Sequence, residues 1–186
     1  ALALVTTQKR LLAHKVTSQA HEAFGGVVPE IAARAHLDIL PDMMRDILKE
    51  SSLSLNNIDG FAATCGPGLI GGLHVGASFT KTLAFICQKP FMAVNHLAAH
   101  ALTIRLTHEV TFPFLLLLAS GGHCQILIVR SACDYKLLGR TLDDAAGEAF
   151  DKVGRLMGLP YPAGPAFEIL ALMGDARRYK LPRPLL

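Results

Sequence analysis

The 186 residues are 51% hydrophobic and only 18% charged, a composition that indicates a folded protein and excludes a disordered one. Lys and Arg outnumber Asp and Glu by three, an excess too small to indicate nucleic-acid binding by itself. The longest wholly apolar stretch, 114–119, is too short to cross a bilayer, so no membrane partner is expected.

The first third of the sequence predicts a β-hairpin, strands 2–6 and 11–17, followed by helices. Pro29 and Glu30 are expected to begin a helix, because proline suits the first turn and an acid there complements the helix dipole. Pro41 is expected to end this helix, and a second one is predicted to run to about Glu50. The residues predicted to face the core are Ile31, Ala35, Ile39, Met44, Ile47 and Leu48.

The next segment predicts a short strand, 61–64, then a glycine-rich loop and a helix over 75–87. Gly66, Gly68, Gly71 and Gly72 would let an anion approach the backbone ahead of a helix N-terminus. The loop fits neither a Walker A motif nor GxGxxG. A tight strand-to-helix connection with only a structural role explains the same glycines equally well.

A strand is predicted at 91–94, after which Asn95 is a candidate N-cap for a helix carrying His96 and His100. The i,i+4 spacing places both imidazoles on one helix face, where they can reach one cation. Spacing alone favours two ordinary surface histidines, and a metal would need a third ligand from elsewhere, an Asp or Glu. Leu97 occupies the position of the catalytic Glu in HExxH, which argues against a peptidase.

The remainder predicts a fully buried strand at 114–119, a turn at 120–123, strands at 125–129 and 135–139, and an acidic helix at 143–157. A loop at 161–165 and a short helix to about residue 173 follow. The turn, Ser-Gly-Gly-His, is either a glycine-favoured hairpin turn or a set of exposed amides for a phosphate. The acidic residues of the helix either form surface pairs with Lys152 and Arg155 or bind ribose hydroxyls.

Alternating strands and helices indicate an α/β fold, and two hairpin-led halves suggest two domains that meet near residues 107–112. The four cysteines form no CxxC pair and lie in apolar segments, so buried, reduced thiols are expected. No signal peptide is predicted at the start. The opening ALALVTT is typical of the middle of a strand, so we expect the sequence to continue beyond both ends.

Six segments together resemble the tRNA threonylcarbamoyladenosine transferase family, that is, bacterial TsaD and its mitochondrial and archaeal relatives, also called the O-sialoglycoprotein endopeptidase family. The similarity runs from about residue 11 to 184 in the family's order and spacing. The segments are FGGVVPE with ARAH (24–36), GPGLIGGLHVG (66–76), NHLAAHALTIRL (95–106), LASGGHCQILIV (118–129), LDDAAGEAFDKVGRLMGLPYP (142–162) and AGPAFE (163–168).

The resemblance implies an actin/Hsp70/sugar-kinase-like (ASKHA) fold of two domains around a nucleotide cleft. Residues 1–109 would form the first domain without its first strand, and 110–186 the beginning of an incomplete second domain. The family transfers a threonylcarbamoyl group from threonylcarbamoyl-AMP to the adenine at position 37, next to the anticodon, of tRNAs that read codons beginning with A. The expected partners are therefore tRNA and threonylcarbamoyl-AMP.

By resemblance, His96 and His100 are metal ligands, for Fe²⁺ or alternatively Zn²⁺, together with a family Asp far downstream. The positions that match adenylate contacts are Leu118, Ala119, Ser120, Gly121, Gly122, Asp151, Gly164 and Glu168. Further expected partners are a metal-free paralogue and an ATPase in bacteria, or a second copy of the chain in mitochondria. Bacterial cytoplasm is the first expectation for its location and the mitochondrion the second.

The sequence departs from the family pattern at several positions, including Asn95 in place of a usual His and Ala163 in place of a usual Gly. The opening strand with its phosphate-binding turn and the downstream metal-binding Asp are absent, and Leu97-Ala98 replaces Met-Glu. Catalysis by this chain alone is therefore expected to be impaired. The competing hypotheses are a non-catalytic scaffold like the paralogue, a metallopeptidase, and a sugar kinase or ATPase of the same fold.

Overall fold

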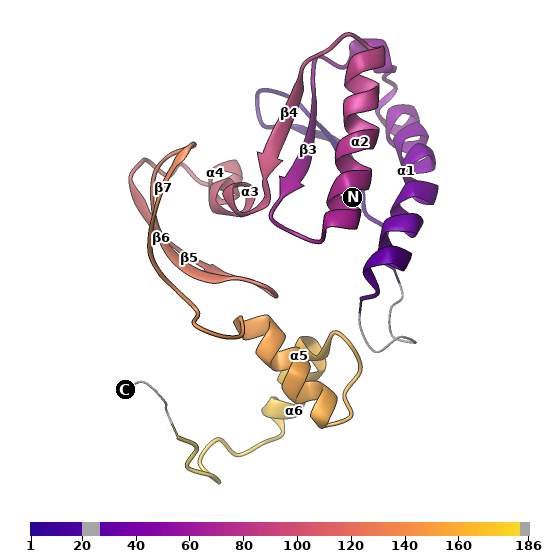
Figure 1. The fold of residues 1–186 in the computed structure, drawn as a ribbon. Coiled ribbons are helices and arrows are strands. Elements are labelled where there is room, and N and C mark those ends of the chain that lie inside the picture. Colours follow the sequence, from indigo (N-terminus) through magenta and orange to yellow (C-terminus); the bar gives the residue numbers. More distant parts are fainter. Residues whose placement is uncertain (20–26, 183–186) are drawn as a thin grey trace.

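The structure, a computed structural model, describes residues 1–19 and 27–182. The beginning of the FGGVVPE segment, residues 24–26, and the last residues of the predicted similarity, 183 and 184, lie outside the described residues. In the described part, strands and helices alternate as an α/β fold requires (Figure 1). Three separate sheets are present among these residues, two of two strands and one of three.

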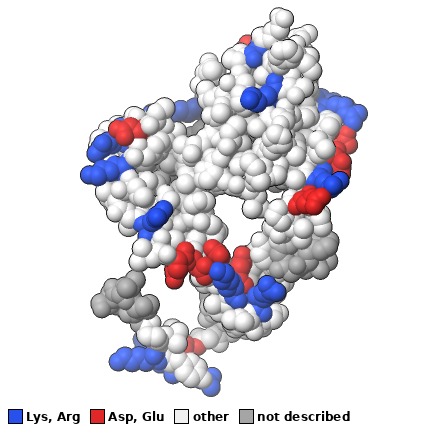
Figure 2. Space-filling view, viewed as in Figure 1, with Lys and Arg blue, Asp and Glu red and all other residues white. Residues whose placement is uncertain are grey.

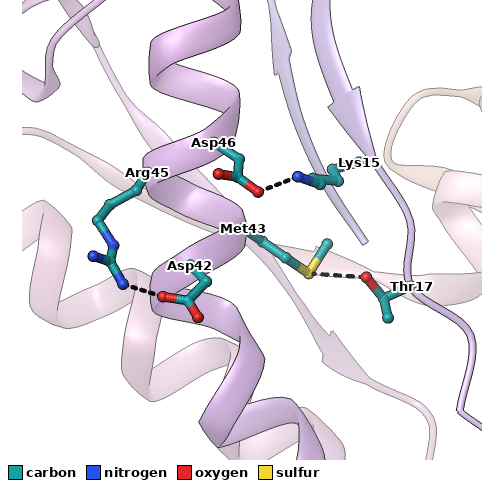
Figure 3. Close-up of polar contacts among 6 residues, drawn as sticks. All are labelled: Lys15, Thr17, Asp42, Met43, Arg45 and Asp46. Atoms are coloured by element: carbon teal, nitrogen blue, oxygen red, sulfur yellow. Dashed lines mark hydrogen bonds and ion pairs between the residues drawn. The ribbon is translucent and has the colours of Figure 1, made fainter.

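The N-terminal hairpin is confirmed: β1 (Leu2–Val5) pairs antiparallel with β2 (Leu11–Lys15). Both strands pack against α1 (Pro29–Ser51). Figure 3 shows the polar side of this contact, where the Lys15 ammonium pairs with the Asp46 carboxylate. Beside it, the Thr17 hydroxyl lies 3.8 Å from the sulfur of Met43.

Helix α1 corrects the prediction that Pro41 would end a helix, because it continues through Pro41 for 23 residues. Proline cannot donate to the carbonyl of Leu37, but both residues are exposed, so water can solvate that carbonyl. The predicted core stripe was also shifted: Ile31 is 40% exposed, while Ile47 is buried as expected. The buried residues of the helix are Ala32, Leu40, Met43 and Ile47.

The central sheet pairs β3 (Phe61–Gly66) in parallel with β4 (Phe91–Asn95). They are connected by α2 (Ile70–Ile86), which packs against α1 and against both strands (Figure 1). The helix begins five residues before the predicted start, so Gly71 and Gly72 are helical rather than in a loop. A methyl group at Gly71 would lie only 3.1 Å from the Cβ of Ala33, so this glycine permits close packing of α1 and α2.

After β4 the chain forms α3 (His96–Leu102) and α4 (Ile104–Thr107). A connection, residues 108–113, leads to an antiparallel sheet of β5 (Phe114–Ala119), β6 (Cys124–Ser131) and β7 (Asp134–Arg140), with β6 in the centre. The prediction of a fully buried β5 was wrong. Leu115 and Leu117 are 69% and 71% exposed, whereas Leu118 is buried, because the strand has one covered and one open face.

The last two helices, α5 (Ala146–Leu156) and α6 (Ala163–Leu172), pack together below the three-stranded sheet in Figure 1. Both begin at different points from the predictions, α5 three residues later and α6 inside the predicted loop. All four cysteines lie in the described range and are free, but two are exposed and two half-buried, so the prediction of buried thiols was wrong. Within the described residues, no helix is long and apolar enough to cross a membrane.

Candidate functional site

The histidine pair lies on α3, directly after the end of strand β4. As predicted, Asn95 caps this helix: its side-chain oxygen accepts hydrogen bonds from the amides of Leu97 (2.9 Å) and Ala98 (3.1 Å). The rings of His96 and His100 are edge to face, with centroids 4.5 Å apart and planes inclined by 79°. His96 is half-buried and His100 is exposed.

The pair supplies two of the three or four donors that a transition metal takes from a protein. In residues 1–19 and 27–182, no set of three His, Cys, Asp or Glu side chains lies close enough to hold a metal ion. Neither ring has a hydrogen-bonding partner in the same range, although metal-ligating histidines usually donate their second N–H to an acceptor. The imidazoles therefore fit half of a metal site.

The glycine turn between β5 and β6 has an ordered frame and an open tip. The amide of Ser120 donates to the carbonyl of His123 (2.8 Å), and the amide of His123 donates to the Ser120 hydroxyl (3.1 Å). Gly121 and Gly122 are exposed at the tip, and their amides find no acceptor in the described part of the chain. Such free, adjacent amides are suited to an anion.

The first turn of α5 lies directly against this tip. A methyl group at Gly147 would lie 2.7 Å from the Cα of Gly121, closer than any side-chain carbon can approach. The amide of Ala146 donates to the sulfur of Cys124 at 3.2 Å and fixes the helix start to β6. Gly147 therefore permits close contact between the glycine turn and α5, a role that no sequence pattern indicated.

A cavity of about 570 Å³ opens between the glycine turn and helix α5. Its volume lies in the range of small-molecule sites. Charged side chains gather over α5 beside the hollow in Figure 2. The residues lining the cavity are Gly121, Gly122, Glu148, Asp151, Lys152, Arg155, Leu159, Pro160, Tyr161 and Ala163.

Two carboxylates neutralise the lysine of this cavity. Lys152 pairs with Asp144 at 2.5 Å and with Glu148 at 3.0 Å, as the i,i+4 spacing of Glu148 predicted. These hydrogen bonds, that to Asp144 first, raise the pKa of the Lys152 ammonium above its ordinary value. The group therefore remains a cation, but its charge is already compensated before any anionic ligand arrives.

Asp151 has a structural partner that the sequence did not indicate. Its carboxylate oxygen accepts a hydrogen bond from the amide of Ala163, the first residue of α6, at 2.8 Å. The expected surface pair with Arg155 is not formed. Asp151 thus lines the cavity and joins the two helices that form its floor.

A second cavity, of about 600 Å³, lies between the two halves of the chain. His36 of α1 and His96 of α3 line it from the first half, and Gly122 and His123 from the second. Gly122 lines both cavities, so the glycine turn forms their common boundary. His36 and His123 occur in the motifs quoted above, but no local spacing marked them as site residues.

The structure brings together part of the predicted adenylate site. Gly121, Gly122 and Asp151 line one cavity. Leu118 is buried at the end of β5, with Ala119 exposed beside it and Ser120 in the turn. Gly164 and Glu168 lie on α6, outside the lining of either cavity.

Comparison with known proteins matches residues 10–186 to the TsaD family, described as tRNA N6-adenosine threonylcarbamoyltransferase. Two curated relatives with that description come from Wolbachia sp. subsp. Drosophila simulans (strain wRi), 54% identical over all of this chain and 56% of the relative, and from Brucella canis, 58% identical over 95% of this chain and 50% of the relative. The chain thus spans about half the length of the curated relatives it matches.

Among solved structures, YeaZ from Pseudomonas aeruginosa superposes with a TM-score of 0.41 at 23% identity, over 57% of this chain and 50% of that one. The sequence match, in contrast, extends over almost every residue and includes the histidine pair, the glycine turn and helix α5. The chain belongs to the TsaD family of tRNA N6-adenosine threonylcarbamoyltransferases.

Proposed function

We propose that this chain carries the adenylate-binding part and two metal ligands of a tRNA threonylcarbamoyltransferase. The substrates are threonylcarbamoyl-AMP and the adenine at position 37 of tRNAs that read codons beginning with A. The names of its relatives support the reaction class, since both are described as tRNA N6-adenosine threonylcarbamoyltransferase. The proposed fold is ASKHA-like, with residues 1–109 in the first domain and 110–186 beginning the second.

The observation that carries the proposal is the position of Gly122 between the two cavities. A nucleotide held in the cavity of α5 would present its phosphate to the free amides of Gly121 and Gly122. The acyl end of such an adenylate would then extend into the second cavity, toward His96. The two cavities together provide a path from a nucleotide to the histidine pair.

The reaction is an acyl transfer in which the adenine N6 amine attacks the carbamoyl carbon. A C–N bond forms, the C–O bond to phosphate breaks, AMP leaves, and the amine loses a proton. The glycine amides can stabilise the charge that accumulates on the phosphate oxygens, because they are fixed by the turn before the reaction begins. Glu148 and Asp151 are the carboxylates available to ribose hydroxyls in the first cavity.

His96 and His100 would hold the proposed cation, Fe²⁺ or alternatively Zn²⁺. When bound, such an ion supplies Lewis acidity toward the phosphate and carbamoyl oxygens. The cap at Asn95 orients both rings from the end of β4, which is how this chain prepares the site. The remaining ligand is proposed to come from an Asp outside the sequence.

The partners of the proposed enzyme are tRNA, a metal-free paralogue and an ATPase in the bacterial cytoplasm. In a mitochondrion, the alternative location, a second copy of the chain takes the place of these proteins. The competing scaffold hypothesis has one observation in its favour: only two candidate metal donors lie together in the described residues.

The test is complementation of cells depleted of the modifying enzyme, with threonylcarbamoyladenosine measured in hydrolysed tRNA. We expect a protein that contains this chain and has the full length of the curated relatives to restore the nucleoside. The double variant His96→Ala, His100→Ala should reduce it to the level of the depleted cells, because the proposed cation would lose both of its ligands in this chain. The matched control is His108→Ala, an exposed histidine just after α4. Undiminished nucleoside in the double variant would contradict the assignment of the metal ligands.

Metal content gives a second, independent readout. The purified enzyme should retain close to one iron or zinc ion per chain, and the double variant should lose it, while His108→Ala should keep it. If the protein of the relatives' full length restores no modification but still associates with the partner proteins, the scaffold hypothesis is the better description.

A further inference from the structure

The residues that follow α6 form a basic arm, defined here as residues 175–182. It contains Arg177, Arg178 and Lys180 against a single carboxylate, Asp175. The arm therefore carries two of the three positive charges by which the chain exceeds neutrality. The net charge of the chain is small, but positive charge is concentrated in this arm. A local concentration of positive charge attracts a polyanion.

The cations of the arm are free to meet a ligand. All eight residues are exposed, and none of the three basic side chains forms an ion pair with a residue in the described ranges. Asp175 is occupied in shaping the backbone instead: its side chain accepts from the amide of Arg177 (2.9 Å) and its carbonyl from the amide of Arg178 (3.1 Å). The resulting turn fixes the backbone from which Arg177 and Arg178 project.

An aromatic ring lies among these charges. Tyr179 is 68% exposed, and the guanidinium carbon of Arg178 lies 5.3 Å from its ring centroid. The arm borders a surface hollow of about 960 Å³ that Arg177, Tyr179 and Lys180 line together with Pro182. Figure 2 shows the blue side chains gathered at the lower end of the molecule, away from the charged side chains of α5.

We propose that the basic arm is an RNA-contacting element that holds the loop of the tRNA substrate. Arg177, Arg178 and Lys180 contact phosphates, and Tyr179 stacks on a base that the loop exposes. Single-stranded loops are recognised in this way, because their phosphates and unstacked bases are both accessible. The inference rests on the proposed function for the identity of the RNA, but not for the binding chemistry.

RNA is favoured over an anionic membrane by the composition of the arm. A membrane-binding segment combines cations with an apolar face that enters the lipid. Here Leu181 is the one large aliphatic side chain among eight residues, and the aromatic residue lies between cations. This arrangement suits phosphate and base contacts along a single strand.

The test is equilibrium binding of a labelled, unmodified anticodon stem-loop to the 186-residue chain at several salt concentrations. We expect Arg177→Gln, Arg178→Gln, Lys180→Gln together to weaken binding at least tenfold. The salt slope should fall by about two, since each phosphate contact to a single strand contributes about 0.7. The matched control is Arg45→Gln, Lys49→Gln, Lys136→Gln, three exposed cations elsewhere, which should change binding less than twofold.

Tyrosine variants separate stacking from charge. Tyr179→Ala should weaken binding about tenfold without changing the salt slope, whereas Tyr179→Phe should bind as the unaltered chain does. Equal losses in the arm variant and the control variant would overturn the proposal. So would no binding by the unaltered chain, or stronger binding to phosphatidylserine vesicles than to the stem-loop. Because binding is measured without transfer, failure of the complementation test leaves this result interpretable by itself.

Discussion

At the scale of single residues, Asp151 has two roles, and the sequence alone does not indicate both of them. Its carboxylate lines the first cavity, and the same group accepts the amide of Ala163 at 2.8 Å. The i,i+4 pattern pointed to Arg155 instead, because sequence patterns describe one helix at a time. The histidine pair and its cap at Asn95 were predictable for the same reason, since all three residues lie within one helical turn and its start.

The role of Asp151 in joining the helices is testable by stability. We expect Asp151→Ala to lower the free energy of unfolding by about 1 kcal/mol, as for the loss of other side chains that cap a helix. Asp151→Asn should lose less, because its amide oxygen can still accept from Ala163. Urea denaturation followed by circular dichroism gives both values. Equal effects of the two variants would show that the hydrogen bond to Ala163 contributes nothing.

The Lys15–Asp46 contact between β2 and α1 predicts that the stability of the protein decreases in acid. The hydrogen bond from Lys15, reinforced by its charge, holds the pKa of Asp46 below its ordinary value of 3.8. A lowered folded-state pKa stabilises the protein above about pH 3.8, and this stabilisation is lost as pH falls through the folded pKa. Thermal midpoints of the unaltered chain and Lys15→Gln should therefore differ near neutral pH and converge in strong acid.

The control for this comparison is Arg34→Gln, which removes an exposed i,i+4 pair with Glu30. That pair joins two residues of one helix, so its loss should shift the midpoint less than the loss of a contact between elements. A gap between the unaltered chain and Lys15→Gln that persists unchanged at the most acidic pH would contradict the linkage to Asp46.

At the scale of elements, the type and order of strands and helices were predictable, but not their burial. The continuous helix through Pro41 and the open face of β5 both depend on which side meets solvent, and local patterns do not record that. The apolar stretch 114–119 would have the same sequence with one or with both faces covered. The close approach of α1 to α2 is likewise absent from local patterns: a methyl group at Gly71 would lie 3.1 Å from the Cβ of Ala33, a residue 38 positions earlier.

The contact between α5 and α6 predicts opposite effects on stability for two glycine-to-alanine substitutions. A methyl group at Gly154 would lie 2.2 Å from the Cβ of Ala163, so Gly154→Ala must separate α5 from α6. We expect a loss of about 1–3 kcal/mol in the free energy of unfolding, as overpacking typically costs. Gly76→Ala in α2 meets no atom within 4 Å and should instead gain up to about 1 kcal/mol from helix propensity. Equal changes in the two variants would refute the packing argument.

At the scale of the whole molecule, the two halves are connected by residues 108–113. Most of this connection is exposed, although the guanidinium of Arg105 lies 4.4 Å from the ring centroid of Phe112. We expect a glutamate-specific protease to cut after Glu109 faster than after Glu50 or Glu148, which lie in helices. Mass spectrometry of early digests identifies the cuts, and earlier cleavage inside the helices would contradict the division at 109 and 110.

The meeting of the two cavities at Gly122 was beyond prediction from sequence for a related reason. His36, His96 and His123 come from three separate motifs, 24–36, 95–106 and 118–129, and only the folded chain brings them to one cavity. The resemblance to the family identified these motifs together, but their spacing in the sequence did not indicate that they line the same cavity. The position of a site between elements is a property of packing.

The position of Asn95 limits which mutations this stretch of the chain can accept during evolution. It is at once the last residue of the β4 ladder, opposite Gly66, and the cap of α3, so no spare residue separates sheet from helix. One residue inserted after it would turn both imidazoles by about 100° around the helix axis and advance them by about 1.5 Å. Substitutions in this stretch can therefore accumulate in a lineage, whereas insertions and deletions should be eliminated.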